Sequence, residues 1–158
     1  MQLILVRHGH AVSDDVDPSR PLSDTGREEA RKTAAQLKAQ GFSAAVIYHS
    51  QKKRARETAC ILKEVFCPEA RLVEKEGLGP NDRTGGLAEA LDQETGNVCL
   101  VGHMPFVACL LSRLVTGYEN EIFVHFRTGT AAVLDKDAAG RWDIHSIIHP
   151  EEGNQRAS

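Results

Sequence analysis

The sequence has few cysteines, no long apolar run and no strong excess of charge of either sign. Its 4 cysteines (Cys60, Cys67, Cys99 and Cys109) include no C-x-x-C pair, so we expect neither a disulfide framework nor a catalytic thiolate. The apolar runs are far too short to span a bilayer. Lys and Arg number 19 against 22 Asp and Glu, a net charge of −3. The composition therefore requires no nucleic acid and no membrane as partner, and we expect neither.

The N-terminus also lacks the pattern of a signal peptide, because Arg7 and His8 interrupt the apolar stretch that follows Met1. We therefore expect a cytoplasmic protein. There is no internal repeat, low-complexity block or long linker. The length of 158 residues suits one domain, which we assign to residues 1–150, with 151–158 as a flexible tail.

Apolar stretches of strand length alternate with stretches of helical periodicity along most of the chain. Strands are predicted at 3–6, 44–50, 71–74, 97–103, 121–126, 130–135 and 142–148. Helices are predicted at 26–41, 54–66, 87–94 and 105–115. This alternation predicts an α/β fold, a single-domain three-layer α/β/α sandwich with a mostly parallel sheet. In such sheets, ligands bind beyond the carboxyl ends of the strands.

Three of the predicted strands end in cationic or imidazole side chains. The first ends at Arg7, His8 and Gly9, the strand 97–103 ends at His103, and the strand 44–50 leads into a basic run that contains Arg54. If the sheet is parallel, these ends meet at one edge. Clustered cations are costly unless an anion joins them, and the planar guanidinium of arginine suits phosphate. The pattern therefore favours a pocket for a phosphoryl group.

Two histidines in such a pocket suggest a mechanism, since a neutral imidazole can attack phosphorus and form a phosphohistidine. Gly9 would let the backbone approach closely. Each motif also has a structural interpretation. Such a basic run is more often a solvated helix face or a nonspecific anion patch, and the Gly-His pair of the fourth strand is compatible with a turn and a buried core histidine. Residue types and spacing alone leave both interpretations open.

The motifs taken together resemble those of the histidine phosphatase superfamily, which has the phosphoglycerate-mutase-like fold. The similar segments are LVRHGHA at 5–11, RPLSDTGREEA at 20–30, HSQKKRARET at 49–58 and LVGHMP at 100–105. The resemblance implies that His8 is the nucleophile and that Arg7, Arg54 and His103 bind the phosphoryl group, with Gly9 beside them. No ligand spacing supports a metal site, and we expect neither a metal nor a cofactor.

The small size of the chain narrows the resemblance, because no insertion is present that would cap the pocket as in the mutases. A chain of this kind is most similar to the bacterial phosphohistidine phosphatases. The resemblance therefore implies an open site that admits a protein-borne phosphohistidine, such as that of a histidine-phosphotransfer domain.

The sequence departs from the family pattern at two positions. Gln51 stands where proline is usual, and His10 where many relatives have an acid; we expect His10 to be an exposed loop residue. The proton donor is also unresolved. Glu76 and Asp82 are the first candidates, and Asp14, Asp15 and Asp17 could also reach the pocket rim, although solvated loop carboxylates are the simpler interpretation of all five. Because imidazole can leave already carrying its proton, a missing acid would favour an N–P substrate.

Two other functions remain open at this point. The chain could be a small-molecule phosphomonoesterase of the same superfamily, or a module that binds phosphoproteins without hydrolysing them. Around the site, Ser23 is predicted to cap the first helix. Thr128 and Thr130 are predicted either to reach the phosphoryl pocket or to form a turn capped by hydroxyl groups.

Overall fold

The computed structural model describes residues 1–150, in which a six-stranded sheet has the order β3-β2-β4-β1-β5-β6. The predicted tail, 151–158, lies outside the described residues. The strands are β1 (Gln2–Arg7), β2 (Val46–His49), β3 (Arg71–Glu74), β4 (Val98–Gly102), β5 (Ala131–Lys136) and β6 (Trp142–Ile148). β1 to β4 are mutually parallel, β5 pairs with β1 in the antiparallel direction, and β6 pairs with β5 in the antiparallel direction. The prediction of a mostly parallel sheet is confirmed.

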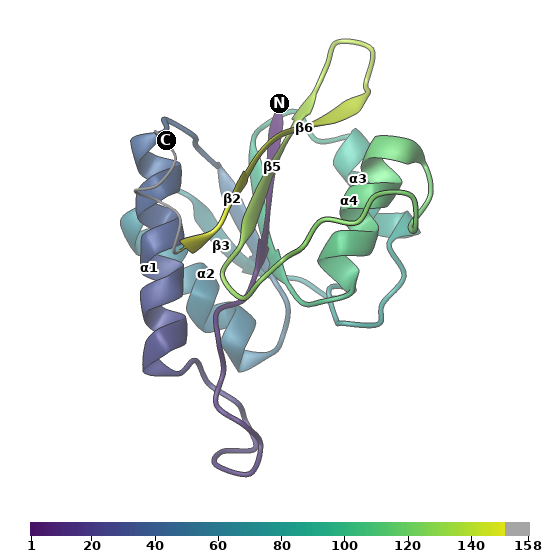
Figure 1. Cartoon of the computed structure of the whole chain (residues 1–158). Coiled ribbons are helices and arrows are strands. Elements are labelled where there is room, and N and C mark those ends of the chain that lie inside the picture. Colours follow the sequence, from purple (N-terminus) through teal and green to yellow (C-terminus); the bar gives the residue numbers. More distant parts are fainter. Residues whose placement is uncertain (151–158) are drawn as a thin grey trace.

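Helices cover both faces of this sheet (Figure 1). The helices are α1 (Asp24–Ala39), α2 (Lys53–Val65), α3 (Gly85–Asp92) and α4 (Phe106–Thr116). One apolar cluster joins α1 and α2 to the sheet and the other joins α3 and α4 to it. β1 contributes to both clusters, because Ile4 and Val6 point to one face while Leu3 and Leu5 point to the other. The three-layer sandwich is therefore confirmed.

Local chemistry explains where the first helix begins. Ser23 has an extended backbone conformation, and its hydroxyl accepts a hydrogen bond from the Gly26 amide, which confirms the predicted N-cap. The cap is close to the carboxyl end of β1, because the Ser23 amide donates to the His10 carbonyl. The start of α1 is thereby fixed beside the segment that carries His8.

One predicted strand is wrong. Residues 121–126 are not part of any strand. The apolar alternation there has a different cause, since Ile122, Val124 and Phe126 pack on the cluster beside α4 while Phe123 points outward. The amides of Glu121 and Ile122 donate to the Ser112 hydroxyl rather than to a neighbouring strand. Apolar alternation indicates that one side of a segment is buried, and this is true of an extended coil as well as of a strand.

Within residues 1–150, no helix has the length and apolar character needed to cross a membrane.

Candidate active site

The carboxyl ends of β1, β2 and β4 meet at one edge, as the sequence predicts for a parallel sheet. β4 pairs with β1 on one side and with β2 on the other. The His8 amide donates to the Gly102 carbonyl at 3.0 Å, which joins the two strand ends just where each reaches its histidine. The imidazole rings of His8 and His103 consequently lie with their centroids 5.0 Å apart. The site begins as a pair of neighbouring imidazoles.

The Nδ1 nitrogen of His8 is held by the backbone. Nδ1 lies 2.6 Å from the Gly9 carbonyl oxygen. Because a carbonyl can only accept, Nδ1 carries the proton and Nε2 carries the lone pair. The His8 side chain is buried, at 7% exposure. This arrangement presents Nε2 as an unprotonated base or nucleophile.

The charges around His8 favour the same neutral form. Burial lowers the pKa of His8 to about 4, and the positive charges of Arg54, Arg7 and Arg20 act in the same direction, whereas the bond to Gly9 opposes them. The imidazole is therefore uncharged at neutral pH. A neutral imidazole among cations suits the attack on an anionic phosphoryl group, which the cations would neutralise.

His103 is buried and bonded on one side only. Its Nε2 lies 2.6 Å from the Ser50 hydroxyl oxygen at the end of β2, while its buried Nδ1 contacts no hydrogen-bonding partner among residues 1–150. Burial first, and then repulsion by His8 when it is protonated and by Arg54, lower the pKa of His103 to about 3. His103 thus offers a neutral ring whose Nδ1 is available for hydrogen bonding.

The two arginines of the predicted site also have unsatisfied buried donors. Arg7 donates from Nη1 to the Phe126 carbonyl at 2.8 Å. The Nε atoms of Arg7 and Arg54 have no partner among the described residues, and burial lowers the pKa of both guanidinium groups. Buried donors without partners are rare in folded proteins. Together with His103 Nδ1, these atoms are donors with which an anion could be bound.

Two charged residues at this site are not among the sequence candidates. The Arg20 charge lowers the pKa of both His8 and Arg54, and Arg20 Nε donates to the Val12 carbonyl at 3.0 Å. Glu29, on α1, accepts from the His10 amide at 2.8 Å and from the Thr128 hydroxyl at 2.9 Å, and its charge raises the pKa of Arg7. Both residues belong to the RPLSDTGREEA segment, whose similarity to the family pattern could have pointed to them as site residues.

Gly9 has a packing role that the sequence did not reveal. A Cβ at this position would lie 2.5 Å from the Gly26 carbonyl oxygen, so the close approach is to the first turn of α1. The Gly9 amide donates to the Thr58 hydroxyl at 3.0 Å, and that hydroxyl donates to the Arg54 carbonyl at 2.8 Å. Gly9 and Thr58 therefore connect the nucleophile loop to the helix that carries Arg54.

The candidate proton donors fall into two groups. Glu76 and Asp82 line a pocket of about 270 Å³ together with Ser50 and Lys52, so they lie on the same side as the Ser50 hydroxyl that meets His103. Asp82 also accepts from the Gly79 amide at 2.7 Å. The other three, Asp14, Asp15 and Asp17, belong to the loop that projects below the sheet in Figure 1.

The remaining residues noted in the sequence have mostly structural contacts. His10 is exposed, as expected, and its Nδ1 lies 2.7 Å from the Ser23 hydroxyl. Gln51 lines the same pocket as Glu76. The Thr130 hydroxyl accepts from the Arg127 amide and meets His149 Nδ1 at 2.7 Å, an arrangement typical of a capped turn. Across residues 1–150, no cluster of His, Cys, Asp and Glu side chains has the geometry to hold a metal ion.

The fold and the site define an α/β protein with a cationic pocket that suits a phosphoryl group. The model of the histidine phosphatase superfamily (branch 1) matches residues 3–78, which include β1, α1, β2, α2 and β3. The chain belongs to this superfamily. The matched residues contain Arg7, His8 and Arg54, while His103 comes from the part of the fold that follows.

Solved structures extend the similarity to the whole fold. The protein histidine phosphatase SixA complexed with tungstate has a TM-score of 0.86 and 25% identity, covering 96% of this chain and 99% of that one. A phosphoglycerate mutase from Plasmodium falciparum has a TM-score of 0.67 and 25% identity, covering 92% and 88%. A phosphoserine phosphatase from Entamoeba histolytica has a TM-score of 0.65 and 17% identity, covering 92% and 95%. The fold is therefore shared by proteins that act on different phosphorylated compounds.

A curated relative matches over a shorter segment. An uncharacterized chloroplast protein of Arabidopsis thaliana is 43% identical over 60 residues, which is 36% of this chain and 28% of that protein. The matched segment thus spans little more than a quarter of that relative. Family and structural neighbours together support a phosphatase as the class of enzyme.

Proposed function

We propose that the protein is a phosphatase that removes phosphoryl groups from protein phosphohistidine through a covalent phospho-His8 intermediate. The observation that carries this proposal is the state of His8, which is buried, neutral and bonded through Nδ1 to Gly9, with Nε2 unprotonated. Arg7, Arg54 and His103 surround it with buried donors. This is the arrangement that nucleophilic attack on a phosphoryl group requires.

In the first step, the lone pair of His8 Nε2 attacks phosphorus, and the bond between phosphorus and the leaving nitrogen breaks. The leaving imidazole departs with that electron pair and keeps the proton on its other nitrogen. In the second step, water attacks the phosphoryl group, the bond to Nε2 breaks, and His8 returns to its neutral form as phosphate is released. Arg7 and Arg54 would stabilise the charge on the phosphoryl oxygens in both steps.

His103 is assigned the role of a neutral donor in these steps. If the Ser50 hydroxyl donates to Nε2, the ring proton is on Nδ1, which is the nitrogen without a partner among the described residues. Nδ1–H can then donate to a phosphoryl oxygen. The low pKa of His103 keeps the ring from becoming a second cation beside His8.

The likeness to the protein histidine phosphatase SixA, which extends over almost the whole of both chains, favours the phosphohistidine substrate. The exposed positions of Glu76 and Asp82 also favour it, because no carboxylate among residues 1–150 is buried and ready to protonate an alkoxide leaving group. We propose a histidine-phosphotransfer domain or a similar phosphoprotein as the carrier.

A second candidate is a small-molecule phosphomonoesterase. It is favoured by the carboxylates of Glu76 and Asp82 in the pocket next to Ser50, either of which would serve as a general acid for an ester. A pure phosphoprotein-binding module has less support, since binding alone does not need an imidazole with an available nucleophilic nitrogen.

Phosphate release from a phosphorylated histidine-phosphotransfer domain, measured beside a panel of phosphate esters, separates these functions. We expect fast release from the phosphoprotein, slow release from the esters and none with His8→Ala. Fast release from the esters alone would transfer the function to small molecules, and phosphoprotein binding without release would identify a binding module.

A further inference from the structure

The most exposed large apolar side chains lie on two segments that reach the His8 site, one through the Arg20 charge that acts on His8 and the other through the bond from Arg7 to Phe126; we call these segments the two walls of the phosphoryl pocket. Within residues 1–150, Phe123 is 85% exposed, Val16 77% and Tyr118 69%. Val16 belongs to the projecting loop, residues 11–22. Phe123 and Tyr118 belong to the extended segment, residues 117–127. Val16 and Phe123 each lie within four residues of a contact with the site, at Arg20 and at Phe126, which makes them candidates for contact with a bound partner.

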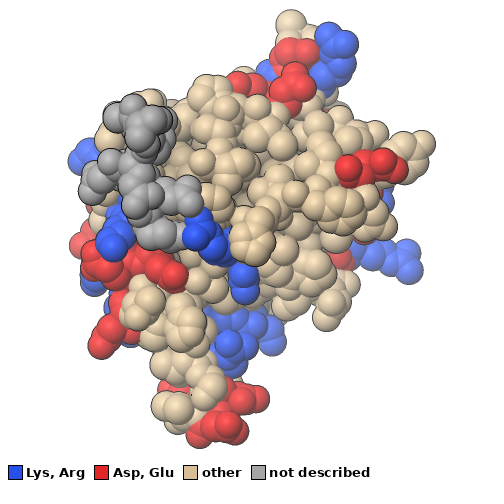
Figure 2. Space-filling model, viewed as in Figure 1, with Lys and Arg blue, Asp and Glu red and all other residues tan. Residues whose placement is uncertain are grey.

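The projecting loop is attached to the pocket at its base. Ala11 and Leu22 form an isolated bridge there, and Arg20 donates to the Val12 carbonyl. Figure 2 shows Lys and Arg atoms gathered beside the base of this loop, with Asp and Glu atoms at its tip. The tip carries Val16 together with the exposed carboxylates of Asp14 and Asp15. The loop therefore projects outward from the site, and its surface is cationic at the base and acidic and apolar at the tip.

The extended segment is attached to the pocket at its other end. It runs from the end of α4 across the molecule to the lower end of β5 (Figure 1). The carbonyl of Phe126 accepts the hydrogen bond from Arg7 Nη1, so its last residues form the wall beside the phosphoryl site. Phe123 is three residues before that contact.

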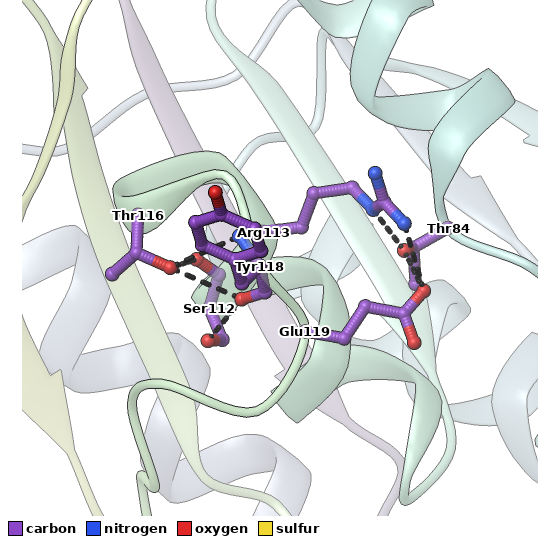
Figure 3. Close-up of polar contacts among 6 residues, drawn as sticks. All are labelled: Thr84, Ser112, Arg113, Thr116, Tyr118 and Glu119. Atoms are coloured by element: carbon purple, nitrogen blue, oxygen red, sulfur yellow. Dashed lines mark hydrogen bonds and ion pairs between the residues drawn. The ribbon is translucent and has the colours of Figure 1, made fainter.

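Phe123 is exposed on a segment that is itself firmly held. The Ser112 hydroxyl donates to the Tyr118 carbonyl and accepts from the Glu121 and Ile122 amides. Near the start of the segment, Thr84 donates to Glu119 at 2.6 Å, and Arg113 contacts both (Figure 3). Ile122 and Val124 pack inward. The outward position of Phe123 is therefore a fixed feature of the fold.

We propose that Phe123 and Val16 form a docking surface, one on each wall of the pocket, for the folded protein that carries the phosphoryl group. This inference rests on the proposed function. His8 is only 7% exposed and a phosphohistidine side chain is short, so the surface of the carrier must come against the pocket rim. The walls would then contact an apolar patch on the carrier, and the acidic loop tip would favour basic residues beside it.

A small phosphorylated molecule seated at His8 does not need either wall, which makes the inference testable by comparing two substrates. We would measure kcat and KM of Phe123→Ser, Val16→Ser and the double variant with a phosphorylated histidine-phosphotransfer domain and with phosphoimidazole. Ile144→Ser is the matched control, because Ile144 is also an exposed apolar residue, at 37%, but lies on β6. All four variants change exposed side chains, and thermal unfolding verifies that they fold.

Truncation of a residue central to an interface costs more than about 1 kcal/mol, which corresponds to about fivefold. Each wall variant should therefore lose at least about fivefold in kcat/KM for the phosphoprotein, mainly through KM. Values for phosphoimidazole should stay within about twofold by the same reasoning, as should both substrates with Ile144→Ser. Asp15→Lys should also raise KM for the phosphoprotein alone.

Two results would overturn the inference, and they are distinguishable. If the wild-type enzyme hydrolyses the phosphoprotein and Phe123→Ser and Val16→Ser do so equally well, the docking surface is wrong while the proposed function stands. If the wild-type enzyme hydrolyses esters but not the phosphoprotein, both the proposed substrate and the docking surface are wrong.

Discussion

Replacing Ser50 by alanine tests how His103 is held in the site. The hydroxyl lies 2.6 Å from His103 Nε2, and both residues are at 2% exposure. Without it, a buried nitrogen loses its partner, which costs about 1–3 kcal/mol of stability. The proton of His103 is then no longer held on Nδ1. If transition-state binding loses the worth of one hydrogen bond, about 1.4 kcal/mol, kcat/KM falls about 10-fold.

Ser112→Ala is the matched control for this experiment. Ser112 is equally buried, and its hydroxyl makes three hydrogen bonds, so this variant should lose at least as much stability. It lies in α4, away from the imidazole pair, and should keep kcat/KM for phosphoimidazole under conditions where both variants are folded. The free energy of unfolding is measured by urea titration. A Ser50→Ala enzyme with wild-type kcat/KM would refute the assignment of His103 as an oriented donor.

Two other predictions follow from burial and packing. Because His8 and His103 have folded-state pKa values lowered to about 4 and about 3, against about 6.5 in the unfolded chain, the unfolded state binds more protons between these values. The stability that the neutral imidazoles contribute is complete above about pH 6.5 and is lost as the pH falls through about 4 and then 3. In urea titrations, the free energy of unfolding of a His8→Gln variant should therefore decline less between pH 7 and pH 4 than that of the wild type. An equal decline would contradict the lowered pKa of His8. Gly9→Ala should destabilise the protein by about 1–3 kcal/mol, because its Cβ would meet the Gly26 carbonyl oxygen at 2.5 Å. If the variant unfolds at the same urea concentration as the wild type, the contact relaxes without cost and this prediction is wrong.

The parts of the site that follow from the sequence are those fixed by strand ends. Arg7 and His8 end a buried strand and His103 follows another, so a parallel sheet brings them to one edge whatever the details of packing. Arg54 follows from the same reasoning because its helix begins just after β2. Sheet topology and local periodicity are enough to predict these positions.

The residues that sequence reasoning missed depend on contacts between distant segments. Arg20 has a left-handed backbone conformation, with φ of 47°, in a loop that folds back on Val12. Glu29, on α1, accepts hydrogen bonds from His10 and Thr128, which lie far apart in the sequence. Neither the turn nor the packing of α1 is visible in residue periodicity. The strand predicted at 121–126 is wrong for a related reason, because one-sided burial produces the same apolar alternation as strand pairing.

His8 is the proposed acceptor of the phosphoryl group. The most direct measurement is rapid quenching of the reaction into alkali, followed by mass spectrometry of the peptide that contains His8. We predict one phosphoryl group on His8 during turnover of the phosphorylated histidine-phosphotransfer domain, and none in His8→Ala. Two results would contradict the assignment of His8 as the nucleophile. One is turnover by the wild-type enzyme with no phosphoryl group on His8 at any time, and the other is undiminished phosphate release by His8→Ala.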